Sequence, residues 1–222
     1  MRHLLIATPA GVLAFLQARA IPASVLVHLA VAAAVALLWY GLATAVAARL
    51  RRTPTRAAAT AGFAAIAAAM LMAPGIVLHL MFSAPAAYLE VQQSSAGTGT
   101  VGYYATLNPL TEWVLAPLAL LLCWPDPATR RPAVAAAVLF YLERAATYLY
   151  FAPAILSWPG ASTSPALIDQ VGLWMQLDWL RIAVNALTIV LFGRAALAAA
   201  AQASSAPPRP VGHGSAGHRA RS

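Results

Sequence analysis

Five long apolar segments dominate this sequence and leave the chain few ways to fold. They cover residues 23–48, 57–83, 107–124, 132–157 and 173–197. Each approaches or exceeds the roughly 20 residues that a helix needs to cross a bilayer, and the third is the shortest. Inside lipid the backbone has no water to bond, so such segments must form helices. The sequence therefore predicts an all-α, polytopic membrane bundle of five transmembrane helices over residues 21–200.

The composition excludes a soluble globular domain. Of the 222 residues, 61% are hydrophobic and 9% are charged, whereas soluble domains carry about 25% charged residues. All 14 basic residues are arginines, and most of them flank the apolar segments, which favours a role in topology over nucleic-acid binding. The single cysteine, Cys123, excludes an intramolecular disulfide.

Arginines are confined to alternate connections between the apolar segments. The first and third connections and the residues after the last segment contain them, whereas residues 84–106 and 158–172 contain none. Because cytoplasmic loops carry the excess of arginine, we expect the amino terminus outside and the carboxyl terminus in the cytoplasm. The chain is then a multi-pass protein of the cell membrane.

Three stretches outside the spans have their own signatures. Residues 1–20 combine a basic start, a short apolar run and small residues near Arg19, which fits either a cleaved signal peptide or an uncleaved interfacial segment. Residues 91–108 are rich in Gly, Ser and Thr and predict a flexible outer loop. Residues 201–222 predict a disordered cytoplasmic tail.

Four charged residues interrupt the last two apolar segments. At 1.5 Å per residue, Arg144 lies about 20 Å above Arg131 and Arg181 about 20 Å above Arg194, with Glu143 and Asp178 nearby. Each such charge costs at least ~2.5–3.5 kcal/mol at the centre of a span unless it is paired. We therefore expect one ion-paired layer near the bilayer midplane, in which Glu143 meets Arg181 and Arg144 meets Asp178.

The residues around these charges follow helical spacing. The last segment places polar and aromatic side chains on one face, and the preceding segment carries a similar stripe. These residues are Trp174, Asp178, Arg181, Asn185 and Thr188 on one helix, and Tyr141, Arg144, Tyr148 and Phe151 on the other. The pattern predicts either a structural clamp that fixes helix register or a ligand site lined by Tyr141, Tyr148, Trp174, Asp178 and Asn185.

Further ionisable groups are expected between this layer and the outer face. Helical rise places Glu112 about 27 Å above Arg130, and His28 and His79 about 31 and about 34 Å above Arg49 and Arg56. Glu112 either complements the start of its helix or serves as a general base. His28 and His79 are either interfacial imidazoles or ligands of a haem. The protein is thus expected to resemble a cup that opens to the outside.

The later part of the chain resembles the anthrone-oxygenase-like membrane proteins over roughly residues 60–200. The resemblance rests on Arg144 followed by Pro153, on WMQLDWLRIAVNALTIVLF, and on APGIVLHLMFSAPAAYLEVQ. It implies a four-helix membrane bundle and oxidation of anthrones to anthraquinones without a metal or organic cofactor. It carries over Arg144, Trp174, Trp179 and Arg181, and less directly His79. The first span is additional, and Ala154 stands where many members have Asn.

These observations lead to three hypotheses of function. The first is a binder of a hydrophobic aromatic or quinone-like molecule, or a cofactor-independent oxygenase-like oxidoreductase with His79, Glu112, Arg144 and Arg181 as catalytic residues. The second is a non-catalytic assembly factor, partner subunit or homo-oligomer, suggested by the small residues of the first two spans. The third is a haem-bearing electron carrier. The first hypothesis requires neither a metal nor a cofactor.

Overall fold

The computed structural model describes residues 8–15, 24–50 and 53–205, and all regular structure in these ranges is helical. A short helix covers residues 8–15. The other elements are α2 (Val25–Arg49), α3 (Pro54–Met81), α4 (Pro85–Gln93), α5 (Ser95–Pro109), η1 (Leu110–Leu115), α6 (Ala116–Cys123), α7 (Pro127–Ala146), η2 (Thr147–Phe151), α8 (Ala152–Ser157) and α9 (Pro165–Ser205). The segments η1 and η2 are π-helical.

Five helical rods in the described ranges are long and apolar enough to cross a membrane. They are α2, α3, the rod α5–η1–α6 (Ser95–Cys123), the rod α7–η2–α8 (Pro127–Ser157) and α9. The predicted all-α architecture with five candidate spans is thus confirmed, and the protein is a multi-pass membrane protein by this criterion. The third and fifth rods are longer than the apolar segments that predicted them.

The expected flexible loop at residues 91–108 is wrong, because most of this stretch is helical. Ser94 caps α5 by accepting a hydrogen bond from the Ala96 N–H. Gly97 is required at the sharp turn from α4, since a Cβ there would overlap the Gln92 carbonyl. The Tyr103 hydroxyl then ties α5 to α3 by donating to the Met70 carbonyl at 2.7 Å. Specific contacts therefore order a segment whose composition is typical of a loop.

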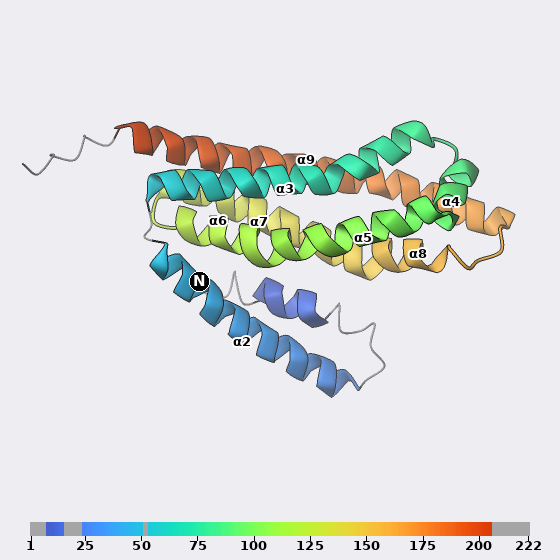
Figure 1. The fold of residues 1–222 in the computed structure, drawn as a ribbon, viewed down its shortest axis with the longest axis horizontal. Helices are drawn as coiled ribbons and strands as arrows, with labels where there is room; N and C mark the ends of the chain where they lie inside the picture. The colour runs from blue at the N-terminus through green and yellow to red at the C-terminus, as the bar shows by residue number, and fades with distance from the viewer. Residues whose placement is uncertain (1–7, 16–23, 51–52, 206–222) are drawn as a thin grey trace, which may run out of the picture.

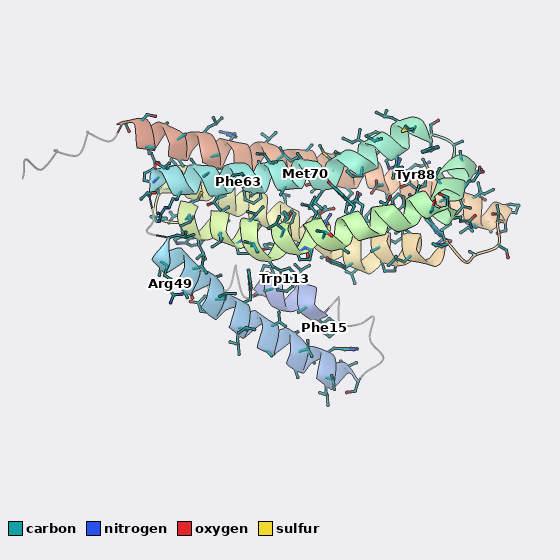
Figure 2. The ribbon with its side chains drawn as sticks, viewed as in Figure 1. Phe15, Arg49, Phe63, Met70, Tyr88 and Trp113 are labelled. Atoms are coloured by element: carbon teal, nitrogen blue, oxygen red, sulfur yellow. The ribbon has the colours of Figure 1, made fainter. Side chains whose placement is uncertain are left out.

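Four of the rods form a bundle, and α2 is peripheral (Figure 1). The long helix α9 packs along α3 and α7, while α6 closes the bundle by packing on the same two helices. The helix α2 packs mainly on α6 and diverges from the bundle toward its amino-terminal end. Trp113 joins the two parts, because its ring meets Trp39 of α2 edge-on at 5.8 Å (Figure 2).

Small side chains fill the bundle at the end where α3 begins and α9 ends. Ala61, Ala64 and Ala68 of α3 recur on one helical face and are fully buried, as are Ala195 and Ala199 of α9. Their size lets the two backbones approach closely, as small residues do in membrane helix pairs. The small residues of the second span, which had suggested an oligomer interface, are therefore largely used within the chain.

Both π-helical segments precede a proline. Pro117 follows η1 and Pro153 follows η2. A proline ring clashes with the carbonyl four residues earlier, and proline has no N–H to donate to it. In these two rods the affected carbonyls are those of Trp113 and Leu149. A local π-helical turn moves that carbonyl aside. Pro74 in α3 is accommodated differently, because the Met70 carbonyl that it leaves unbonded accepts from Tyr103.

The two ends of the chain are only partly described. Residues 8–15 form a helix that packs on α2, where Gly11 lies close to Ala36. Whether residues 1–20 are cleaved as a signal peptide stays a prediction. The disordered tail was predicted to begin at residue 201. This boundary is too early, because α9 continues to Ser205. Residues 206–222, like 1–7 and 16–23, lie outside the described residues.

Substituting Ala64 tests the close packing of α3 on α9. We expect Ala64→Leu to lower the free energy of unfolding by about 1–3 kcal/mol, because the extra atoms overpack a filled interface. Denaturation in mixed micelles measures this change. Ala59→Leu, at an exposed alanine of the same helix, is the matched control and should have little effect. Equal loss in both variants would contradict the packing argument.

Candidate functional site

One buried layer of charge crosses the bundle. Its members come from α3, η1, α7 and α9, and their side chains are almost entirely shielded from solvent. They are His79, Glu112, Glu143, Arg144, Asp178 and Arg181. Their contacts form one continuous chain from His79 at one end to Glu112 at the other.

Glu143 lies at the centre of this layer. It binds the adjacent Arg144 in bidentate fashion, with both oxygen–nitrogen distances at 2.5 Å. Its Oε1 also accepts from Arg181 Nη1 at 3.3 Å and from the Thr147 hydroxyl at 3.1 Å. One carboxylate therefore joins α7 to α9 and holds both guanidinium groups.

On the Glu112 side, the layer extends through Arg144. Its Nη1 donates to Asn108 Oδ1 at 2.9 Å and lies 3.8 Å from Glu112 Oε1. The Tyr148 hydroxyl donates to the Glu112 carboxylate at 3.0 and 3.1 Å. The Tyr141 hydroxyl donates to the Glu112 backbone carbonyl at 2.9 Å. Glu112 is thus held by two tyrosines and one arginine.

On the other side, the layer ends at a histidine. Asp178 Oδ1 accepts from Arg181 Nε at 2.5 Å, and its Oδ2 lies 2.8 Å from His79 Nε2. Because a carboxylate only accepts, His79 carries its proton on Nε2. The His79 ring stacks against Tyr88 and Trp179, with centroids 5.6 and 5.0 Å away. Its Nδ1 is buried and has no hydrogen-bond partner among the described residues.

The charges of the layer do not balance without one further proton. Two guanidinium groups face three carboxylates, a net charge of −1 if all are ionised and His79 is neutral. Burying an unbalanced charge is costly, and one added positive charge would make the layer neutral.

The predicted pairing is half right. Glu143 does meet Arg181, but Arg144 bonds Glu143 and Asn108 rather than Asp178. Asp178 instead accepts hydrogen bonds from Arg181, three residues away on the same helix, and from His79. Proximity in sequence explains the difference. Arg144 bonds the adjacent Glu143, and Arg181 bonds Asp178 one helical turn earlier.

Glu112 and His79 lie in the layer, and the expectation that they lie above it is wrong. The estimated depths took Arg194 as the end of its helix, yet α9 continues to Ser205. Glu112 likewise lies in the middle of its rod rather than at its start. The exposed apolar side chains of α9 run from Leu173 to Leu197, so Asp178 and Arg181 lie toward the Leu173 end.

A cavity of about 400 Å³ lies directly against this layer. Its charged and amide side chains are Gln92, Asn108, Arg144, Asp178 and Arg181, and the hydroxyls of Thr100 and Thr147 also line it. Most of the other lining residues are aromatic or apolar, among them Leu78, Tyr88, Tyr104, Tyr148, Phe151, Ile155, Leu156 and Trp174. Ala105 of α5 and Leu156 of α8 line it and are exposed, so the cavity reaches the surface of the bundle between these two helices.

The predicted site residues divide into two groups. Arg144, Arg181, Tyr148, Trp174 and Asp178 line the cavity. The other predicted residues are not among its lining: His79 bonds Asp178, Glu112 accepts from Tyr148, and Tyr141 lines a separate groove. Asn185 is buried one to two turns along α9, and its Oδ1 has no hydrogen-bond partner among the described residues.

The sequence interpretation missed the wall that α4 and α5 provide. Thr100, Tyr104 and Asn108 line the cavity, and their spacing of four residues marks one helical face. Tyr88 and Gln92 repeat that spacing in α4. The periodicity was present in the sequence, but the Gly, Ser and Thr residues between favoured a loop. Burial raises the pKa of the Tyr88 hydroxyl, so this group faces the cavity uncharged.

The two histidines proposed as haem ligands make separate contacts. His79 bonds Asp178 through Nε2, whereas the His28 ring meets Phe15 edge-on at a centroid distance of 6.2 Å. His28 belongs to the first turn of α2, and this end of the helix diverges from the bundle (Figure 1). Within the described ranges, no group of three or more His, Cys, Asp and Glu residues is arranged to hold a metal ion.

Comparison of the chain with models of protein families, with curated proteins and with solved structures found no match.

Removing the central carboxylate tests the charged layer. We expect Glu143→Gln to lower the free energy of unfolding by about 3–5 kcal/mol, because it leaves two buried guanidinium groups without their shared partner. Denaturation in mixed micelles measures the loss. Glu90→Gln, on the exposed side of α4, controls for charge and should be neutral. A Glu143→Gln protein as stable as the control would show that the layer does not hold the helices together.

Proposed function

We propose that this chain is an integral protein of the cell membrane that binds a hydrophobic aromatic or quinone-like molecule. One observation carries the proposal: a cavity walled by aromatic side chains has two oriented guanidinium groups in its lining. Binding sites for small molecules combine such an apolar enclosure with a few fixed polar groups. A ring system with an oxygen substituent matches both parts.

The arginines suit a ligand oxygen because carboxylates fix their orientation. A guanidinium has five N–H donors, and the bonds of Arg181 to Asp178 and Glu143 use two of them. Preorganised donors of this kind stabilise negative charge that develops on a bound oxygen, such as that of an enolate or phenolate. The rings of Phe151, Trp174 and Tyr104 would pack against the ligand body.

Oxidation of the bound molecule is the further step that the family resemblance suggests. The net reaction would be that of an anthrone with dioxygen to give an anthraquinone and water. Glu112 is the better proton acceptor, because Tyr148 lines the cavity and donates to its carboxylate. A proton leaving the ligand would pass to Tyr148 while the Tyr148 proton passes to Glu112. His79 would act only through Asp178, as a positioning residue.

The arginine distribution supports an orientation with the amino terminus outside. Arg49 is the last residue of α2, and Arg56, Arg130 and Arg131 belong to the first turns of α3 and α7. These helix ends lie at one end of the bundle, toward which the Arg194 part of α9 also runs (Figure 1). Among the described residues of the opposite end, α4 and the α8–α9 connection contain no arginine. By the positive-inside rule, the cavity then belongs to the outer half of the membrane. Its opening between α5 and α8 would admit a ligand from the outer leaflet.

A non-catalytic partner subunit has less support than a ligand site. The alanines of α3 are buried within the chain, and on α2 Ala32 is buried while Ala36 lies against Gly11. What remains available is the exposed apolar surface of α2, which lipid alone can cover.

Ligand binding can be tested with 1,4-naphthoquinone as the probe. Because Trp174 lines the cavity, we expect the quinone to quench tryptophan fluorescence saturably in detergent-solubilised protein. Arg181→Gln should weaken binding at least tenfold, the effect of about 1.4 kcal/mol or more from a charge-assisted hydrogen bond. Ala105→Trp should block binding by filling the cavity without altering the charged layer.

Two controls separate binding from folding and from catalysis. Arg56→Gln changes an exposed arginine remote from the cavity and should bind like the wild type. Turnover of anthrone in the presence of dioxygen distinguishes an oxygenase from a binder. Saturable quenching that persists unchanged in both Arg181→Gln and Ala105→Trp would refute the cavity as the binding site.

The proposed orientation predicts which loop is accessible from outside the cell. We expect Ser162→Cys, in the connection between α8 and α9, to react with a membrane-impermeant maleimide in intact cells. The native Cys123 is fully buried and provides little background. Labelling that requires prior lysis would reverse the orientation.

A further inference from the structure

A second pocket lies between α7 and α9 at the arginine-rich end of the bundle. Its volume is about 660 Å³. The α7 wall is one helical face, and the α9 wall is another. The lining residues are Pro127, Ala128, Arg131, Pro132 and Ala135 on α7, and Leu191, Arg194 and Ala198 on α9. Small and apolar side chains therefore leave a groove with one arginine on each wall.

Among the described residues, neither arginine of this groove is ion-paired. In the part of the chain that the structure describes, neither Arg131 nor Arg194 makes an ion pair or a side-chain hydrogen bond, and both are exposed. The acidic residue nearest in the chain, Asp126, is engaged with the Ala128 N–H and with Gln202. Arg130 adds a third positive charge over the Trp124 ring. The four charges sum to +2, which favours an anion.

The position of the groove along the bundle identifies the source of that anion. The exposed apolar side chains of α9 end at Leu197, and from Leu173 this belt is about 36 Å long at 1.5 Å per residue. That length slightly exceeds the ~30 Å hydrocarbon core of a bilayer. Arg194 lies in the last turn of the belt, at the level where lipid phosphates lie. Above the groove, Val138 and Leu187 are exposed apolar side chains on the same two helices.

We propose that the groove between α7 and α9 binds one anionic phospholipid, with its phosphate between Arg131 and Arg194 and an acyl chain along Leu191, Val138 and Leu187. Basic pockets between transmembrane helices take up anionic headgroups in this manner. Arginine is suited to it because its planar fork matches phosphate oxygens in bidentate geometry. The site is separate from the cavity at the charged layer and does not depend on the function proposed for that cavity.

Native mass spectrometry of the full chain tests this site with phosphatidylglycerol. We expect one phosphatidylglycerol to remain bound in preference to phosphatidylcholine. The double variant Arg131→Gln/Arg194→Gln should bind about thirtyfold more weakly, the loss expected for two arginines at the membrane surface. Ala198→Phe, which fills the groove and keeps both charges, should also abolish retention.

The matched control is Arg49→Gln/Arg56→Gln, which removes two exposed arginines from other helices at the same end of the bundle. It should retain phosphatidylglycerol like the wild type. Equal loss in both double variants would mean diffuse surface attraction and would overturn the proposal. Displacement of the lipid by inorganic phosphate at equal concentration would overturn it too, because the site would then require no acyl chain.

Discussion

The carboxylate of Glu143 holds two guanidinium groups inside an apolar bundle, and the arrangement of the site depends on it. A single arginine in a span is costly, and two arginines would repel each other without this shared partner. Glu143 brings Arg144 of its own helix and Arg181 of α9 to the same place. Asn108 and Asp178 accept hydrogen bonds from the two arginines, Glu112 lies opposite Arg144, and His79 donates to Asp178.

The helices deviate from regular geometry at the level of this layer. η1 contains Glu112, and η2 contains Thr147, Tyr148 and Phe151. Each π-helical segment precedes a proline, so Pro117 and Pro153 determine where the two helices are distorted. A π-helical turn changes the direction in which the side chains after it point, and such turns are frequent at functional sites. Here they let Tyr148 bond Glu112 while still lining the cavity.

Much of the fold was predictable from the sequence, because hydrophobic length and the cost of unbonded backbone in lipid leave little freedom. The inward face of α9 was predictable as well: Trp174, Asp178, Asn185 and Thr188 are all buried, as their spacing indicated. The arrangement of the charged layer was less predictable. Depth counted from arginine anchors fails when a helix continues past its anchor, as α9 does beyond Arg194.

The wall formed by α4 and α5 was missed for another physical reason. Its order comes from contacts distant in sequence, such as Tyr103 with the Met70 carbonyl that Pro74 leaves unbonded. The composition of residues 91–108 does not indicate that such a partner exists in another helix. A proline in one span and a tyrosine in another therefore have to be considered together before the segment can be recognised as a helix.

The sequence presented a clamp and a ligand site as alternatives, but several of the residues concerned both bond within the charged layer and line the cavity. Glu143 is not among the residues that line the cavity, whereas Arg144, Asp178 and Arg181 both bond within the layer and line the cavity. Loss of stability on changing a charge therefore does not argue against a ligand. A structural role and a binding role can be distinguished at residues that line the cavity but make no contact with the charged layer, such as Ala105. If filling the cavity from that side changes nothing but ligand retention, the layer serves both structure and binding.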